Sequence, residues 1–516
     1  MRALSASVVL STMVLGGCLT VAKAQDLDLD NPPSMNSEFG GQPYDSDTLP
    51  PGHIPQPSLE NPGLVTGVTL GQLYTDNLRL ARSDGSKQSG LITQVQPFVK
   101  GASSGPRFSG MFDYALNGYL YEKPSGHNQL AQNLDARGTF TILPQHFFLD
   151  GAVSYGQQII NNQLPSGGGT FFLTNNRANV GIATLSPYWL QDLGRVGTMS
   201  LRYTHGRVVY NDRGLGSENG SLLSGIPDVT LDSAQFNMQS PQYQTWGWNL
   251  SYSEERVTPD FGPSWDFAIA KLGGSVQVND SLRLLVDGGK ENKFLPDGTV
   301  EKLGSTFWEA GFQWVTSRDN VKFMVGHRFF GRSYQLSWTH QAALLTTNVS
   351  YVERPTTYNQ QLMGMDFGSG GLPPVNVRPD IPSLLERQPY LMKRLSASAL
   401  YTMPKSRLSL RVYDELRTYF EDSDRRERAA SADLSWMFDL GPFTTMTPSV
   451  RWLRRQFRDG QTTNGHYAQL TLVHQLDTKN FGSIRVRHDN RGVTSAALGA
   501  HGYTVNVIFV QWTHLF

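Results

Sequence analysis

The sequence has a single cysteine, few charged residues and no long apolar run after its first 24 residues. One cysteine among 516 residues excludes an intramolecular disulfide framework and any cysteine-based zinc or iron–sulfur array. Charged residues make up 17% of the chain, whereas a soluble domain has about 25%. The 44 basic and 44 acidic residues cancel, so no overall field points to nucleic acid as a partner. Beyond Leu19 no stretch approaches the roughly 18 to 20 apolar residues of a helical membrane span.

Aromatic residues and glycine are the residue types that the chain has in abundance. It contains 26 Phe, 20 Tyr, 10 Trp and 51 Gly, and its mean hydropathy is nevertheless polar, at -0.34. This combination argues against a helical membrane protein and against a long disordered chain.

Residues 1–24 have the pattern of an export signal. Arg2 supplies the positive charge, residues 3–15 form an apolar core, and Ala-Lys-Ala ending at Ala24 is a complete cleavage site. We therefore predict a signal peptide over residues 1–24. An alternative is that residues 15–18 form a lipobox, in which case Cys18 would be lipidated.

Residues 25–63 differ sharply in composition from the rest of the chain. They contain seven acidic residues, no Lys or Arg and many prolines. Such a segment cannot bury enough apolar area to offset its ordering entropy. We predict an acidic, proline-rich disordered arm, whose role is either a solubilising linker or a partner-binding strap. About 39 residues is too short for the folded plug domain of a TonB-dependent transporter.

After Leu64 the dominant pattern is an alternation of apolar and polar residues with period two. In one segment Trp246, Trp248 and Leu250 share one face of a strand, whereas Gly247 and Asn249 lie on the other. Segments of this kind recur to the end of the chain, each with one apolar and one polar face. Period two is the signature of strands that are buried on one side only.

About 22 such strands follow one another, with a range of 18 to 24, and short turns alternate with longer polar loops. The longest loops cover residues 162–176, 212–228 and 356–392. A soluble sandwich or propeller would turn the apolar faces inward, but no blade repeat is present. Export, strand length and the alternation of short turns with long loops favour the other arrangement. We predict an all-β fold, a closed antiparallel transmembrane β-barrel formed by residues 64–516.

The C-terminal strand supports the membrane barrel. The last residue is aromatic, and every second residue before it is apolar or aromatic with one exception, a histidine. The alternating residues are Ile508, Val510, Trp512, His514 and Phe516. This pattern resembles the terminal strand signal that the barrel-assembly machinery reads in bacterial outer-membrane barrels. We therefore expect the outer membrane of a Gram-negative bacterium as the location, and its lipid and the assembly machinery as partners.

Arginine recurs on the polar faces of the last third of the chain. The residues are Arg407, Arg411, Arg451, Arg455, Arg485 and Arg487. One hypothesis is that they line the lumen as a track for an anionic solute, because guanidinium groups match carboxylate and phosphate. The alternative is that lumen acids such as Asp414, Asp433 and Asp489 pair with them and hold a rigid wall.

Enzyme chemistry finds little support in the sequence. His488 and Asp489 are consecutive, and neighbouring residues of a strand point to opposite faces. His205 and His327 are isolated candidates, and no nucleophile elbow, HExxH or CxxC pattern occurs. We predict that the protein is not an enzyme, with no catalytic residues, no metal and no cofactor.

The sequence resembles one family, the outer-membrane β-barrel proteins associated with the PEP-CTERM/exosortase system, which occur with exopolysaccharide biosynthesis loci. The resemblance begins near Pro62 and is carried by YTDN at residues 74–77, LRYTHGRVVYND at 201–212, GHRFFG at 326–331 and SYQLSWTH at 333–340. It implies a barrel for polysaccharide export or surface assembly. It brings no catalytic residues, and the long segment 356–392 has no place in the family's pattern.

Three functional hypotheses follow from these observations. The leading one is a passive outer-membrane conduit or assembly factor for exopolysaccharide export, with anionic polysaccharide and secretion proteins as partners. The second is a general or anion-selective uptake porin. The third is a structural or adhesin barrel that binds a partner through the loop at residues 356–392.

Overall fold

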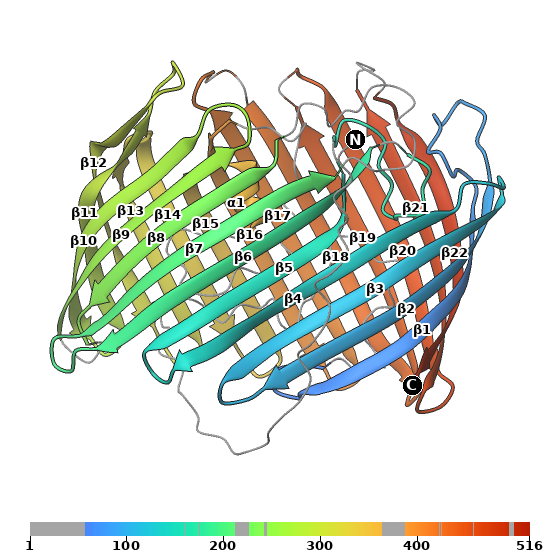
Figure 1. Ribbon diagram of the computed structural model, residues 1–516, viewed down its shortest axis with the longest axis horizontal. Coiled ribbons are helices and arrows are strands. Elements are labelled where there is room, and N and C mark those ends of the chain that lie inside the picture. Colours follow the sequence, from blue (N-terminus) through green and yellow to red (C-terminus); the bar gives the residue numbers. More distant parts are fainter. Residues whose placement is uncertain are drawn as a thin grey trace, which may run out of the picture.

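The barrel is one sheet of 22 antiparallel strands that closes on itself (Figure 1). Closure is complete because β1 (Gly63–Thr75) pairs with both β2 (Gly90–Ser104) and β22 (Tyr503–Leu515). Every spanning strand therefore has a neighbour on both sides, which removes the unpaired edge that hydrocarbon would not tolerate. The predicted all-β closed antiparallel barrel is confirmed.

The computed structural model describes residues 57–159, 161–174, 176–211, 227–241, 245–363, 388–422, 424, 426–457, 459–494 and 500–516. The predicted signal peptide, Cys18 and most of the predicted arm lie outside the described residues. No helix among the described residues is long and apolar enough to cross a membrane.

The remaining strands follow in chain order, with one short helix between β15 and β16. They are β3 (Phe108–Lys123), β4 (Gln129–Leu143), β5 (Phe147–Ile159), β6 (Arg177–Asp192), β7 (Thr198–Asn211), β8 (Val229–Gln239), β9 (Trp246–Pro259), β10 (Trp265–Asn279), β11 (Leu282–Phe294), β12 (Val300–Val315), β13 (Asp319–Arg328), β14 (Gly331–Gln341), β15 (Leu345–Thr356), α1 (Tyr358–Leu362), β16 (Tyr390–Met403), β17 (Ser406–Tyr419), β18 (Arg426–Gly441), β19 (Thr444–Gln456), β20 (Thr462–Gln475) and β21 (Asn480–Val493).

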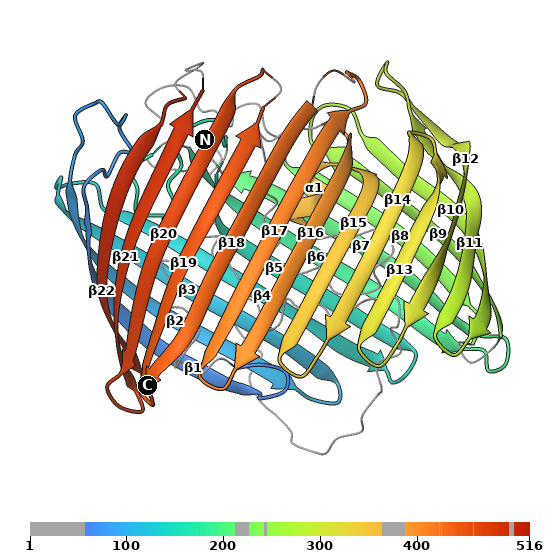
Figure 2. The same cartoon turned by 180° about the vertical axis from the view of Figure 1, so that it is seen from behind.

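The two ends of the barrel differ in the length of their connections. At the end where the chain terminates, the strands are joined by turns such as 144–146, 404–405 and 442–443. The opposite end carries the longer connections, of which 160–176 and 357–389 are two. Figures 1 and 2 show strongly tilted strands, and the C-terminus lies at the short-turn end. In bacterial barrels the short turns are periplasmic and the long loops extracellular.

Hydrogen bonds within the turns fix the short connections locally. The carboxylate of Asp477, between β20 and β21, accepts hydrogen bonds from the backbone N–H groups of Lys479 (2.8 Å) and Asn480 (2.9 Å). These bonds favour the ionised carboxylate, so the pKa of Asp477 lies below its ordinary value.

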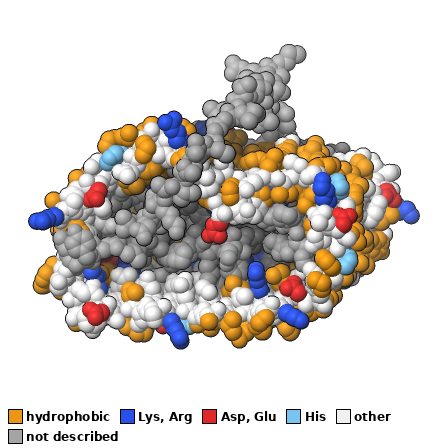
Figure 3. All heavy atoms as spheres, turned by 90° about the horizontal axis from the view of Figure 1, so that it is seen from below, with side chains coloured by type: hydrophobic (Ala, Val, Ile, Leu, Met, Phe, Trp, Pro, Cys, Tyr) orange, Lys and Arg blue, Asp and Glu red, His pale blue; other side chains and the backbone are white. Residues whose placement is uncertain are grey.

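Large apolar side chains cover the outer face of the barrel. Trp246 is 72% exposed, Trp308 56% and Leu250 43%, whereas Asn117 and Thr471 on inner faces are buried. Figure 3 looks at the short-turn end and shows hydrophobic side chains around the rim of an elongated outline. The apolar faces therefore point outward, as the alternation predicts for a membrane barrel.

The last strand follows the predicted alternation. Ile508, Val510, Trp512 and Phe516 are exposed on the outer face, and His514 lies between the rings of Trp512 and Phe516, with centroids 5.7 and 5.3 Å away. The odd-numbered residues of β22 point into the barrel. Among these, Val505, Val507 and Phe509 are buried because a loop packs against them from inside.

Candidate functional site: the inner wall of the barrel

The inner wall of the barrel has two regions that differ in the charged residues that they carry. The first region, here called the paired wall, is the inner face of β1–β14. The second, here called the arginine wall, is the inner face of β15–β22. The strand pairings place each residue on one face or the other, because partners in register share a face.

The paired wall carries cations and carboxylates in nearly equal number. The cations are Lys100, Arg137, Arg202, Lys271, Arg283, Lys322 and Arg328, and the acids are Asp113, Asp135, Asp150, Asp192, Glu255, Asp287, Glu291 and Glu309. Four of the cations lie in ion pairs. The pairs are Lys100–Asp113 (2.8 Å), Arg202–Asp150 (2.7 Å), Lys271–Asp287 (3.4 Å) and Arg328–Glu291 (2.5 Å).

The arginine wall has twice as many cations as acids. Its cations are Arg354, Arg394, Arg407, Arg411, Arg417, Arg451, Arg455, Arg485, Arg487 and Arg491, and its acids are Glu415, Glu427, Asp433, Asp439 and Asp489. All six arginines that the sequence predicts for the lumen lie on this inner face. Four further arginines were missed, although Arg417 and Arg491 have the same parity in their strands as the predicted ones.

Two of the three acids predicted to pair with lumen arginines lie on the arginine wall. Asp433 is 3.3 Å from Arg451, and Asp489 is 3.2 Å from Arg487. The prediction was wrong for Asp414, which is on the outer face and binds Arg428 through two hydrogen bonds of 2.8 and 2.9 Å. Its even parity in β17, shared with Leu410 and Val412, places it outside.

A buried ion cluster occupies the long-loop end of the arginine wall. Glu415 contacts both Arg417 and Arg394, the latter at 2.5 Å, and the side chains of Glu415 and Arg417 are 1% and 2% exposed. The hydroxyl of Tyr413 donates a third hydrogen bond to Glu415, at 2.6 Å. The Glu415 carboxylate thus bridges two guanidinium groups inside the barrel.

The connection between β5 and β6 folds into the barrel and covers part of the arginine wall. Its residues 161–174, here called the inner loop, are mostly buried. Arg491 donates hydrogen bonds to the carbonyls of Asn162 (2.8 Å) and Gln163 (2.6 Å) and also to that of Leu164, and Arg487 donates to the carbonyl of Gly168. These arginines are therefore anchors of a loop.

Apolar and aromatic contacts fix the tip of the inner loop. Phe171 packs against Phe509 and Tyr119, with ring centroids 5.5 and 6.4 Å apart, and its carbonyl accepts a hydrogen bond of 2.5 Å from Tyr121. Gly167 has a φ of +48°, and a Cβ there would lie 2.5 Å from the ring of Phe172. Only glycine suits this position.

Helix α1 forms a second inner element (Figure 2), which packs in a different apolar cluster of the inner wall from the one that contains Phe171 and Phe172 of the inner loop. Thr357 caps it in a capping box with Gln360. Asn359 accepts a hydrogen bond of 2.7 Å from Tyr210 of β7, and Gln361 accepts one of 3.4 Å from Arg417 of β17. The helix therefore connects the paired wall to the arginine wall.

Burial divides the six predicted arginines into two groups. Arg485 and Arg487 are 3% and 6% exposed beneath the inner loop and neighbouring rings. Arg407 is exposed, and Arg411, Arg451 and Arg455 are half-buried. The accessible part of the arginine wall therefore lies on β17 and β19.

The accessible arginines recur every four residues along their strands. Arg407 and Arg411 lie on β17, and Arg451 and Arg455 on β19. Four residues of a strand span about 13 Å. Arg411, Asp433 and Arg451 lie in one row across three strands. This arrangement offers several forked donors to an extended anion.

The histidines considered as candidate catalytic groups lie on the outer face, away from the lumen. His488 is exposed there and contacts Asn506 at 2.7 Å, whereas its neighbour Asp489 points inward. His205 contacts Asp232 at 2.8 Å. Among the described residues no group of three or more His, Cys, Asp or Glu side chains is arranged to hold a metal ion.

Comparison with known proteins finds solved structures with a similar fold but identifies no family for this chain. No family model matches the chain, and no curated protein matches it. The FrpB iron transporter from Neisseria meningitidis aligns with a TM-score of 0.46 at 10% identity, covering 88% of this chain and 82% of that one. The siderophore receptor PirA from Acinetobacter baumannii aligns with a TM-score of 0.44 at 10% identity, covering 87% of this chain and 80% of that one. A variant of the ferric enterobactin receptor PfeA from Pseudomonas aeruginosa aligns with a TM-score of 0.46 at 9% identity, covering 90% of this chain and 81% of that one.

Proposed function

We propose that the protein is a passive outer-membrane conduit for an anionic solute, and that this solute is an exported acidic polysaccharide. The observation that carries the anionic part is the arginine wall, with ten arginines against five acids. A surface lined by one sign of charge concentrates counter-ions and lowers the barrier to their entry. The polymer part rests on the resemblance to exopolysaccharide-associated barrels.

The spacing of the accessible arginines suits a polymer. Arg407 lies near the short-turn end of β17, and Arg455 lies next to the long-loop end of β19. A chain that bears a carboxylate at intervals contacts several guanidinium groups at once and exchanges them one at a time. Synthesis at the inner membrane supplies the energy, and the barrel binds the chain weakly enough to let it pass.

Ion selectivity in planar bilayers tests the proposal that the conducted solute is anionic. The variant Arg407→Gln, Arg411→Gln, Arg451→Gln and Arg455→Gln removes the accessible cations and leaves the anchors of the inner loop intact. We expect the native barrel to prefer anions and the variant to lose most of that preference, most clearly at low salt. The matched control Lys100→Gln with Lys271→Gln removes cations from the paired wall and should keep the preference. Equal selectivity in all three proteins would contradict the proposal.

Cell assays separate export from uptake. Deletion should abolish surface polysaccharide and leave small-solute uptake unchanged, and the four-arginine variant should show a partial export defect at normal barrel levels. Normal polysaccharide with poor growth on a limiting anionic nutrient would instead assign an uptake porin. Normal behaviour in both assays would favour the structural or adhesin barrel.

A further inference from the structure

The outer face of the barrel carries charged residues at its long-loop end, and many of them are paired with each other. The pairs include Arg256–Asp266 (2.7 Å), Lys302–Glu254 (2.5 Å), Arg207–Asp260 (2.9 Å), Lys393–Glu353 (3.2 Å) and Arg428–Asp414 (2.8 Å). Their place at the ends of the strands puts them above the apolar belt, at the level of lipid headgroups.

Two outward arginines on neighbouring strands depart from this pairing. Arg426 is the first residue of β18, and Arg454 is the third from the end of β19. Both are exposed, and among the described residues the ion pairs of β18 and β19 are formed by Arg428 and Arg451, not by Arg426 or Arg454. Arg428 lies between them on the same face, because it pairs with Gln456 and Arg454 pairs with Ala430. Of the three guanidinium groups, that of Arg428 contacts a carboxylate among the described residues, that of Asp414.

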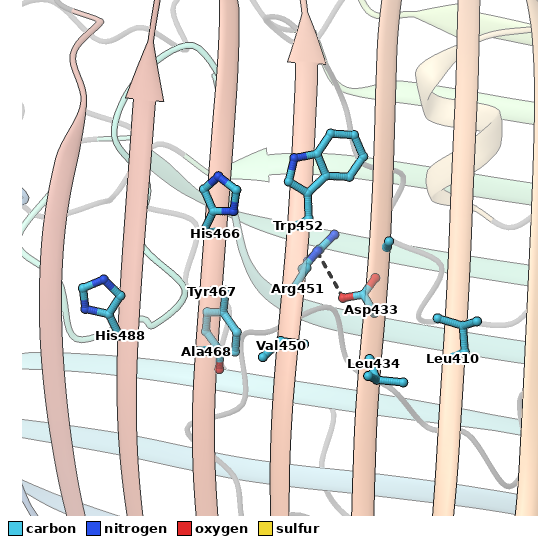
Figure 4. A pocket seen from close by; sticks show the side chains of 11 residues that line it. Leu410, Asp433, Leu434, Val450, Arg451, Trp452, His466, Tyr467, Ala468 and His488 are labelled. Carbon is cyan, nitrogen blue, oxygen red and sulfur yellow. Dashed lines mark ion pairs between the residues drawn. The ribbon is translucent and has the colours of Figure 1, made fainter.

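A groove of about 420 Å³ lies directly below these arginines on the outer wall. Its floor is shallow where Ala432 and Ala468 replace the large side chains of the surrounding belt. Leu410, Leu434 and Val450 border its lower part, and Trp452 and His466 stand side by side at its upper part (Figure 4). The groove is therefore apolar below and polar above.

We propose that this surface, the outer groove with Arg426, Arg428 and Arg454, binds a phosphorylated lipid of the outer leaflet. One acyl chain lies in the groove, and the phosphate of the headgroup contacts the three arginines. Arg454 and Val450 are about 13 Å apart along the tilted strand, so a chain in the groove starts at headgroup level and runs into the hydrocarbon. Guanidinium groups bind phosphate through paired donors.

Charge and position both favour a lipid over a protein partner. Arg426 and Arg454 form no ion pair among the described residues, so a lipid phosphate supplies a counter-charge for them. The apolar part of the groove lies below the strand ends, within the belt that faces hydrocarbon, where a soluble protein does not reach. This site is on the outside of the barrel and is independent of the conduit inside it.

The test measures lipid retention by the purified, delipidated full-length barrel in neutral detergent. The probe is bisphosphorylated lipid A, detected by native mass spectrometry, with phosphatidylethanolamine and inorganic phosphate as comparison probes. Two variants disrupt the two halves of the site: Arg426→Gln with Arg454→Gln removes cations, and Ala468→Phe fills the groove. Arg332→Gln with Lys290→Gln is the matched control, because it removes two cations from the outer face of β14 and β11.

We expect the native protein and the control to retain lipid A and each of the two site variants to bind it at least ten-fold more weakly. Equal retention by all four proteins would overturn the proposal. If the arginine variant binds more weakly but Ala468→Phe does not, or if inorganic phosphate competes as well as lipid A, the patch is a free-anion site and the lipid assignment is wrong. A dimer that protects the groove would likewise overturn it. Heat-modifiable migration in gels shows that each variant is folded.

Discussion

The paired wall and the arginine wall share one β-sheet and one strand geometry, but they compensate charge in different ways. On the paired wall, Lys100 lies directly opposite Asp113 in register, and their charged atoms are 2.8 Å apart. On the arginine wall, Arg411 and Arg451 flank the single carboxylate of Asp433. A chain with no formal net charge can therefore still present a strongly cationic surface, because strand register decides which charges meet.

The same comparison explains why the two walls hold their inner elements differently. Helix α1 rests on the paired wall mainly through apolar contacts that include Tyr358 and Leu362. The inner loop also has apolar contacts at Phe171, but on the arginine wall it is held in addition by hydrogen bonds from Arg487 and Arg491 to its carbonyls. Carbonyl groups are weaker partners of guanidinium than carboxylate or phosphate, and the inner loop leaves Arg487 and Arg491 only 6% and 7% exposed.

Removing the carboxylate of Glu415 is expected to lower the free energy of unfolding more than any other change of charge on either wall. Glu415→Gln leaves Arg394 and Arg417 without their shared carboxylate in a buried site. Removing one partner of a buried ion pair costs about 3 to 5 kcal/mol, because the other charge stays buried without compensation. We expect a corresponding fall in the free energy of unfolding, measured by urea titration of the barrel in detergent micelles. A loss below about 1 kcal/mol would mean that the cluster is hydrated and that the wall is not a closed ionic network.

A charge introduced on the outer face should lower the yield of folded barrel equally on strands of the paired wall and of the arginine wall, because both outer faces contact lipid. Trp248→Arg on β9 and Trp452→Arg on β19 each place a cation on the lipid-facing side, where the native residues are 37% and 40% exposed. Such a charge costs about 2 to 4 kcal/mol near the bilayer midplane and less toward the interfaces. We expect lower yields of folded barrel in both cases, and only a mild effect from Asn249→Ala on the inner face. Equal effects at positions 248 and 249 would reverse our assignment of the faces.

The outer and inner faces could be predicted from the sequence because strand alternation is local. Trp248 and Asn249 are assigned by parity alone, and the same rule would have placed Asp414 outside and Arg417 inside. The inner loop could not be predicted in this way, because its position depends on Tyr121 and Arg491, which are distant in sequence. One local signal did exist: inward Val505 and Phe509 are apolar, and such residues in a polar lumen require a cover.

Releasing the inner loop should alter the arginine wall without destabilising the barrel. Arg491→Gln removes donors to the carbonyls of residues 162–164, and hydrogen bonds from charged groups contribute about 1.5 to 3 kcal/mol. We expect faster amide hydrogen exchange in residues 161–174 and a larger single-channel conductance. Arg407→Gln, on the same wall but far from the inner loop, should leave exchange there unchanged. Unaltered exchange in Arg491→Gln would show that aromatic packing around Phe171 alone holds the loop.

The smallest effect is expected where the paired wall is most exposed. Lys100 and Asp113 form a pair whose side chains are 22% and 48% exposed. Solvated pairs of this kind contribute about 0 to 1 kcal/mol, because the charges are screened and two side chains lose freedom. Lys100→Gln should therefore shift the urea midpoint only slightly, and Lys100→Gln with Asp113→Asn should match it. If instead the single variant were as damaging as Glu415→Gln, the pair would lie in a low-dielectric site. The two walls would then differ in the number of charges but not in how those charges are solvated.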